Sequence, residues 1–223
     1  MTVLDFDKLR NGIIHVGEQK GNNEPPKWLG SGFLVDTQCT FATAKHLLAN
    51  AARDAIVIRF QLPHDLGKVK TIRARVLFEF PDRDLLFLRI DRVDGNRCQS
   101  GNLNPLQLSD RAPDTKLVGQ DIAIIGFPLI TSASNLDIPI LRVGVISATE
   151  ITLENARVIL LDLHEVPGFS GSPVILKATA QVVGVVFGPG PTERLYGFEW
   201  ATAITETDYR KALAEGPQEP PQQ

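Results

Sequence analysis

The chain has 223 residues, of which 43% are hydrophobic and 22% charged, and its formal net charge is −3. That composition is typical of a soluble globular protein with a sizeable core. It lacks the basic excess that nucleic acid or an anionic membrane surface attracts, and no apolar run approaches the ~18 residues that span a bilayer. We therefore expect neither nucleic acid nor a membrane among its partners.

The N-terminus and the two cysteines bear on the cellular compartment. Asp5 and Asp7 lie where a secretory signal peptide needs a basic start followed by a long apolar stretch. Cys39 and Cys98 have no further Cys or His near them at metal-ligand spacing. We predict a cytoplasmic protein with two reduced thiols and no metal site.

Short apolar runs separated by Gly, Pro, Asn and Asp fill the first part of the chain, which is the pattern of β-strands and turns. The run at 71–78 alternates apolar with charged residues, the period of a half-buried strand. A short helical turn is expected at 45–50. The predicted strands cover residues 12–17, 28–36, 39–44, 55–60, 71–78 and 85–90.

Residues 91–120 are rich in Gly, Asn, Ser, Pro and Asp, and we predict a linker there. A capped helix is expected at 207–214, and the Pro- and Gln-rich residues 216–223 are expected to be disordered. Because no helices alternate with strands, the chain is predicted to be all-β, as a pair of barrels or sandwiches. The predicted strands of the second group cover residues 121–126, 140–146, 156–162, 174–176, 181–187 and 198–203.

A tight turn in the second group carries a candidate nucleophile. Ser170 lies between glycines in the segment Pro167-Gly168-Phe169-Ser170-Gly171-Ser172-Pro173. A serine hydroxyl is a weak nucleophile at neutral pH, so it needs a base beside it and backbone N–H groups that stabilise the oxyanion it creates. Glycines allow the backbone to turn so that such N–H groups converge. Taken alone, the segment is equally compatible with an ordinary loop between strands.

Two residues of the first group could supply the base and the acid that orients it. His46 begins the expected helical turn, and Asp84 directly precedes the predicted strand 85–90. Each has an ordinary explanation by itself, as a surface histidine or as a turn residue at the start of a strand. Together with Ser170 they follow the order His, Asp, Ser, which is one of the few known arrangements of a serine triad. The two strand groups would then share one site between them.

These segments resemble the motifs of one family. The chain is similar to trypsin-like serine peptidases of the chymotrypsin fold, and nearest to bacterial HtrA-type and related short trypsin-like peptidases without a PDZ domain. The resemblance covers residues 12–205. Its motifs in chain order are Gly30-Ser31-Gly32-Phe33-Leu34-Val35, Thr43-Ala44-Lys45-His46, Asp84-Leu85-Leu86-Phe87-Leu88, Gly126-Phe127-Pro128, Gly144-Val145-Ile146-Ser147, the Ser170 turn and Val182-Val183-Gly184-Val185.

The resemblance implies two six-stranded antiparallel β-barrels packed face to face, with a short C-terminal helix. The N-terminal barrel covers residues 10–109 and carries the base and the acid. The C-terminal barrel covers residues 115–207 and carries the nucleophile. Residues 208–223 form the terminal helix and the disordered tail of the same peptidase unit.

The resemblance also implies a serine endopeptidase that hydrolyses peptide bonds through an acyl-enzyme. Ser170 attacks the peptide carbonyl, His46 transfers the proton, and Asp84 orients the imidazole. The backbone N–H groups of Gly168 and Ser170 form the oxyanion hole. The substrate is a protein or peptide, and no cofactor is required.

Four residues are expected to bind the substrate side chain that precedes the scissile bond: His164, Val186, Phe187 and Gly188. Glutamate-specific members carry a histidine where Val186 stands, so a preference for glutamate is not supported. We expect a small or apolar side chain at this substrate position.

Two of the departures from the family pattern bear on activity. Lys45 stands beside the base, where a cation that faced the site would disfavour the imidazolium, and we expect its side chain to point to solvent. Phe169 replaces the acid or amide that usually precedes the serine, so activity should not need N-terminal cleavage. These departures leave open the alternative of a catalytically silent trypsin-like binding module. The cytoplasmic composition leaves open a second alternative, an effector protease switched on by an activating partner protein, because an uncontrolled protease in the cytoplasm would be harmful.

Overall fold

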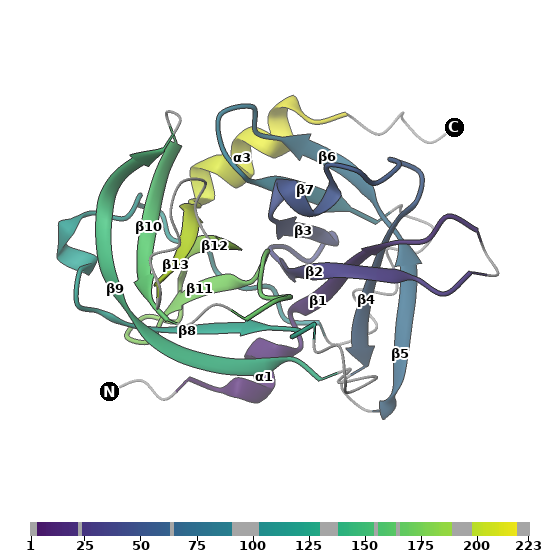
Figure 1. The fold of residues 1–223 in the computed structure, drawn as a ribbon, viewed down its shortest axis with the longest axis horizontal. Coiled ribbons are helices and arrows are strands. Elements are labelled where there is room, and N and C mark those ends of the chain that lie inside the picture. The colour runs from purple at the N-terminus through teal and green to yellow at the C-terminus, as the bar shows by residue number, and fades with distance from the viewer. Residues whose placement is uncertain are drawn as a thin grey trace.

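The computed structural model describes residues 4–21, 24–62, 65–90, 103–129, 138–153, 156–163, 166–188 and 198–217, and within these ranges it leaves out the side chains of 61–62 and 65–70. Figure 1 shows two β-rich halves side by side, with a short helix near each end of the chain. No helix within these ranges is both long enough and apolar enough to cross a bilayer.

The N-terminal half follows helix α1 (Phe6–Arg10) and is one antiparallel sheet of seven strands in the order β5-β4-β1-β2-β3-β7-β6. A 3-10 turn, η1 (Lys45–Leu48), leaves the end of β3. The strands are β1 (Ile13–Glu18), β2 (Lys27–Leu34), β3 (Thr40–Thr43), β4 (Ile56–Leu62), β5 (Asp65–Arg73), β6 (Arg75–Glu79) and β7 (Leu86–Arg89).

The C-terminal half is a closed antiparallel barrel of six strands in the order β10-β13-β12-β11-β8-β9. A short 3-10 turn, η2 (Thr115–Leu117), precedes it, and helix α3 (Glu206–Glu215) follows it. The strands are β8 (Asp121–Gly126), β9 (Ile140–Leu153), β10 (Ala156–Asp162), β11 (Pro173–Leu176), β12 (Val182–Gly188) and β13 (Phe198–Ala203).

The all-β class and the short C-terminal helix are confirmed, but the N-terminal half differs from the prediction. Its sheet has seven strands, and β5 and β6 form its two ends within the described residues, so a second closed barrel is not found there. The single strand predicted at 71–78 is wrong, because β5 ends at Arg73 and β6 begins at Arg75. β5 pairs with β4 while β6 pairs with β7, and no Gly or Pro marks the change of partner.

Strands between two cores bury both of their faces. Successive side chains of a strand point to opposite sides of the sheet. On β1, Ile13 packs in the cluster between the two halves, whereas Ile14 packs in the interior of the N-terminal sheet. On β12, Val185 belongs to the cluster between the halves and Val186 to the barrel interior. The continuous apolar runs in the sequence follow from this two-sided burial.

Part of the predicted linker is a packed element of this interface. Residues 91–102 lie outside the described ranges. After them, the Leu106 N–H donates to the Leu34 carbonyl at 2.9 Å, and Leu108 forms a bridge to Val182. Leu106 and Leu108 are both buried in the cluster between the halves. The connection therefore contributes to the interface between the two sheets.

Helix α3 returns from the C-terminal barrel to the N-terminal half, where it lies beside β6 (Figure 1). Its first turn is fixed by a capping box between Thr205 and Asp208. The second oxygen of the Asp208 carboxylate pairs with the Arg83 guanidinium at 3.1 Å. Tyr209 donates a hydrogen bond to Asp36 in the turn after β2. The helix thus links the end of the chain to the loop that carries Asp84.

The prediction of two reduced thiols is wrong. Cys39, which is fully buried in the turn before β3, is disulfide-bonded, and Cys98 is the only other cysteine of the chain. A disulfide is unusual in a reducing compartment. The cytoplasmic location stays a prediction and loses one of its two arguments.

His15 is buried in the interface between the two halves. Its ring stacks on Trp28 at a centroid distance of 5.1 Å and lies 3.9 Å from the Phe127 ring. The Arg59 guanidinium lies 2.8 Å from Nδ1, and because a guanidinium can only donate, Nδ1 accepts and the proton lies on Nε2. Burial, and secondarily the Arg59 charge, lower the pKa of His15 from 6.5 to about 3.

The depressed pKa of His15 predicts an acid-sensitive fold. Below pH 6.5 the unfolded chain binds a proton that the folded chain rejects, so the free energy of unfolding falls by about 1.4 kcal/mol per pH unit down to about pH 3. We expect the parent to lose about 2 kcal/mol more than His15→Phe between pH 6.5 and about pH 5. Urea unfolding at several pH values measures this difference. Parallel curves for the two proteins would contradict the assignment.

Candidate active site

Strand pairing brings His46 and Asp84 together. β3 and β7 are antiparallel, and Thr43 at the end of β3 pairs with Leu86 at the start of β7. The chain that leaves β3 into η1 and the loop that enters β7 therefore meet at the same edge of the sheet. His46 lies in η1, and Asp84 lies two residues before β7.

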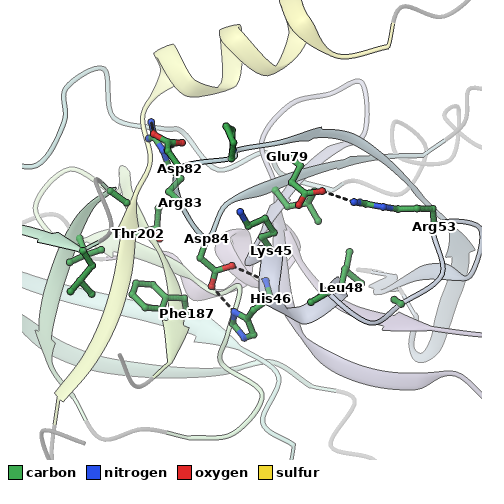
Figure 2. Close-up of a pocket in the computed structure, with 17 residues that line it drawn as sticks. Lys45, His46, Leu48, Arg53, Glu79, Asp82, Arg83, Asp84, Phe187 and Thr202 are labelled. Carbon is green, nitrogen blue, oxygen red and sulfur yellow. Dashed lines mark hydrogen bonds and ion pairs between the residues drawn. The ribbon is translucent and has the colours of Figure 1, made fainter. Parts of the chain in front are cut away.

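The Asp84 carboxylate accepts two hydrogen bonds from His46, one on each oxygen (Figure 2). The backbone N–H of His46 donates to Oδ1 at 2.7 Å, and the ring Nδ1 lies 2.6 Å from Oδ2. Because an ionised carboxylate can only accept, the Nδ1 carries the proton and Nε2 is left as an acceptor. The His46 side chain is 44% exposed, so Nε2 is accessible to a substrate or a nucleophile.

The loop that carries Asp84 is held from two sides. The Lys45 Nζ donates to the Phe80 carbonyl at 2.8 Å, which links η1 to the start of this loop. Arg83, next to Asp84, pairs with Asp208 of α3. The expectation that Lys45 points to solvent is therefore wrong: its half-buried ammonium is occupied by a carbonyl on the loop of the acid.

The turn that carries Ser170 attaches to the edge of β2. The Ser170 carbonyl accepts the N–H of Ser31 at 2.8 Å. Gly171 has φ +87°, and a Cβ there would lie 1.9 Å from the Ser31 carbonyl oxygen, so only glycine fits. A Cβ at Gly188 would lie 3.6 Å from Ser170 Oγ, so the end of β12 passes close to the hydroxyl. Among the described residues, no hydrogen bond joins Ser170 to His46.

The residues before Ser170 form a turn of type II. The Phe169 N–H donates to the Val166 carbonyl at 3.2 Å, Pro167 occupies the second position, and Gly168 has φ +98° at the third. A type I turn would need a negative φ at Gly168. Within the described part of the chain, the N–H groups of Gly168 and Ser170 donate to no protein acceptor, so both are available to an oxyanion.

Phe169 anchors this turn by apolar packing. Its side chain is 2% exposed and belongs to the core cluster of the C-terminal barrel. An acid at this position would need an ionic partner, whereas the phenyl ring is stabilised by the barrel itself.

A cavity of about 640 Å³ opens beside His46 and Asp84, between the two halves. Figure 2 shows Phe187 on the barrel side of Asp84 and the paired Arg53 and Glu79 on the opposite side. The apolar residues that line the cavity are Leu48, Ala49, Ala51, Pro81, Leu86, Leu153, Ala156, Val158 and Phe187. The cavity could receive substrate residues next to the reacting bond.

The four residues expected to bind the substrate side chain differ from one another in their surroundings. Phe187 lines the cavity, and Gly188 lies near Ser170 Oγ. Val186 is fully buried, and its side chain packs in the core of the C-terminal barrel. His164 lies outside the described residues. The preference for a small or apolar substrate side chain stays a prediction.

Sequence reasoning missed three supporting contacts. They are the contacts of Ser31, which the sequence marks only as a motif residue, of Arg83 and of the Leu129 N–H. Leu129 donates to the Pro167 carbonyl at 2.7 Å. For Ser31 a signal existed, since a polar residue in a strand that is otherwise buried usually has a partner.

Comparisons with known proteins bear on the family and the fold of the chain. A sequence model described as the trypsin-like peptidase domain matches residues 30–185. A search of curated protein sequences finds no significant match.

Solved structures share the fold at low sequence identity. Deg5 has a TM-score of 0.65 at 21% identity, over 92% of this chain and 88% of that one. An inactive serine-to-alanine mutant of Rv3671c from M. tuberculosis H37Rv has a TM-score of 0.64 at 16% identity, over 95% and 91%. The HtrA-type protease AlgW, solved with a decapeptide, has a TM-score of 0.64 at 19% identity, over 92% of this chain but only 63% of its own.

Proposed function

The chain belongs to the trypsin-like peptidase family, and from this premise we propose that it is a serine endopeptidase acting on proteins or peptides through Ser170, His46 and Asp84. The observation that carries the proposal is the pair of hydrogen bonds from His46 to the Asp84 carboxylate. The Ser170 turn is close by, since a Cβ at Gly30 would lie 2.7 Å both from the side chain of Leu47, the neighbour of His46, and from the Ser170 carbonyl oxygen. Nothing in the proposed chemistry requires a cofactor, and we propose the cytoplasm as the location.

The proposed reaction uses the accessible ring nitrogen of His46 as the base. Ser170 Oγ attacks the substrate carbonyl while His46 Nε2 takes its proton, and Asp84 stabilises the imidazolium that forms. The Gly168 and Ser170 N–H groups donate to the oxyanion. The C–N bond then breaks, the amine leaves with the proton from His46, and water releases the acyl group from Ser170 by the same steps.

Substrate residues next to the scissile bond would occupy the cavity beside His46. The charged side chains that line it already have protein partners: Arg53 pairs with Glu79, and Arg83 with Asp82 and Asp208. The remaining lining is largely apolar, which favours apolar substrate side chains there. AlgW, a structural neighbour, was solved with a peptide, which supports peptides as the substrate class.

Activity without an activating partner is favoured over the two alternatives. A silent binding module would have no need of available N–H groups at Gly168 and Ser170. A partner-activated enzyme would need a Ser170 turn that changes conformation when the partner binds. The type II turn, with Phe169 buried in the barrel core, favours a turn that is competent at rest. Because the buried Phe169 ring holds the turn, its conformation also does not depend on a new N-terminus produced by cleavage.

Labelling with a fluorophosphonate–rhodamine probe tests the proposal. We expect the purified parent to be labelled at Ser170, because an activated serine attacks phosphorus as it attacks a carbonyl. Heat-denatured parent and the His46→Ala variant should remain unlabelled, and peptide mapping by mass spectrometry should locate the adduct. An unlabelled parent would rule out a constitutive peptidase. Labelling that appears only after a cell extract is added would favour the partner-activated alternative.

A further inference from the structure

We propose that Ser31 is a positioning residue, which holds the Ser170 turn in the form that presents the N–H groups of Gly168 and Ser170 to the substrate. The inference rests on the proposed peptidase function. It adds a residue from the N-terminal sheet to the oxyanion hole of the C-terminal barrel.

The strand pattern directs Ser31 toward the barrel. Ser31 and Phe33 lie two residues apart on β2 and therefore share a face, and Phe33 packs in the cluster between the two halves. Ser31 is fully buried, and its carbonyl accepts the Thr43 hydroxyl at 2.7 Å. Its backbone is thus fixed within the sheet, and its hydroxyl faces the other half of the molecule.

The Ser31 hydroxyl joins two segments of the C-terminal half. It donates to the Gly168 carbonyl at 2.8 Å and accepts the Phe127 N–H at 2.9 Å. The Ser31 N–H also holds the Ser170 carbonyl at 2.8 Å. One residue therefore fixes the carbonyl that lies between the two N–H groups proposed to bind the oxyanion, and also the carbonyl that directly follows them.

The segment that Ser31 holds through Phe127 also orients the peptide before Gly168. Two residues after Phe127, the Leu129 N–H donates to the Pro167 carbonyl at 2.7 Å. In a trans peptide the carbonyl and the N–H point in opposite directions. A Pro167 carbonyl held toward Leu129 therefore directs the Gly168 N–H away from Leu129, which keeps it available.

Loss of the Ser31 hydroxyl should release this turn. Glycine at 168 adopts positive and negative φ about equally well, so the type II form depends on its anchors. Without the hydroxyl, the Gly168 carbonyl and the Phe127 N–H lose their partner. A type I turn reverses the Pro167–Gly168 peptide and removes one oxyanion donor.

Kinetics of fluorophosphonate–rhodamine labelling test the proposal in Ser31→Ala, in Ser31→Cys and in the matched control Ser172→Ala. Ser172 is a second buried serine of this region, and its hydroxyl has no partner among the described residues. We expect the maximal labelling rate of Ser31→Ala to fall about 10- to 100-fold, less than the 100- to 1,000-fold typical for complete loss of a donor, with the probe's half-saturation concentration unchanged. Ser172→Ala should label within about 2-fold of the parent.

A positioning role predicts a lower maximal labelling rate at an unchanged half-saturation concentration. A purely structural role would instead lower the melting temperature and leave the maximal labelling rate of the folded fraction unchanged. Ser31→Cys keeps the side-chain volume with a weaker hydrogen-bonding group and gives the same comparison if the alanine variant does not fold. Crystal structures of parent and variant report the Gly168 φ independently of activity, and we expect it to become negative in the variant. A variant that labels like the parent, or that keeps the positive φ, overturns the inference; an unlabelled parent overturns the proposed function instead.

Discussion

Ser170→Ala is expected to lower the maximal rate of peptide hydrolysis by about 10⁶-fold, because the attacking oxygen is removed and no other nucleophile replaces it. The remaining groups would give a residual rate of about 10³- to 10⁴-fold over water. The measurement is kcat with a fluorogenic peptide selected from a substrate library on the parent enzyme. The fold should be unaffected, since Ser170 is only partly buried and its hydroxyl makes no hydrogen bond within the described residues.

Ser172→Ala is the matched control for this variant, because it removes a hydroxyl from the same turn region without a partner being lost. It should retain the parent's kcat within about 2-fold. Hydrolysis by Ser170→Ala above one percent of the parent rate would show that another residue is the nucleophile.

Asp84→Asn is expected to lower kcat by about 10⁴-fold. The amide has nearly the shape of the carboxylate, but its NH₂ group cannot accept the proton on Nδ1 of His46. The hydrogen bond at 2.6 Å is then kept only if the imidazole adopts the other tautomer, in which Nε2 carries the proton and cannot act as a base. The backbone bond from His46 to Oδ1, at 2.7 Å, can still be accepted by the amide oxygen.

The same fluorogenic assay, run from pH 6 to 10, measures the effect of Asp84→Asn. Asp121→Asn is the control: this exposed carboxylate pairs with Lys177 at 3.2 Å on the barrel surface and should leave kcat unchanged. A loss of less than about 10-fold in Asp84→Asn would argue that Asp84 does not orient the base.

The contacts that hold the loop of Asp84 in place also affect the geometry of the site. Asp84 directly follows Arg83, which pairs with Asp208 of α3, and the loop of both residues begins at Phe80, whose carbonyl is held by Lys45. A carboxylate that must keep two hydrogen bonds in place needs such anchors, because an exposed loop would otherwise exchange between conformations. The terminal helix therefore contributes to the geometry of the site as well as to the core.

Local patterns in the sequence identified most of the strands. Alternation and apolar runs reflect which faces of a strand are buried, and turn residues mark where strands end. These signals located the strands that carry the Gly30-Ser31-Gly32-Phe33 motif and the strand after Asp84. They failed at Ala74, where the chain changes its pairing partner without a turn residue.

The sequence by itself determined the all-β class, the family and the candidate residues His46, Asp84 and Ser170, because these depend on residue order and short-range periodicity. Only the tertiary structure decided that the N-terminal sheet has seven strands, that Lys45 binds the Phe80 carbonyl, and that Cys39 is disulfide-bonded. It alone revealed that Ser31 holds the Gly168 carbonyl, 137 positions along the chain. The physical reason is that a strand pattern states which side of the strand is buried, whereas the partner of each buried polar group depends on the packing of distant segments.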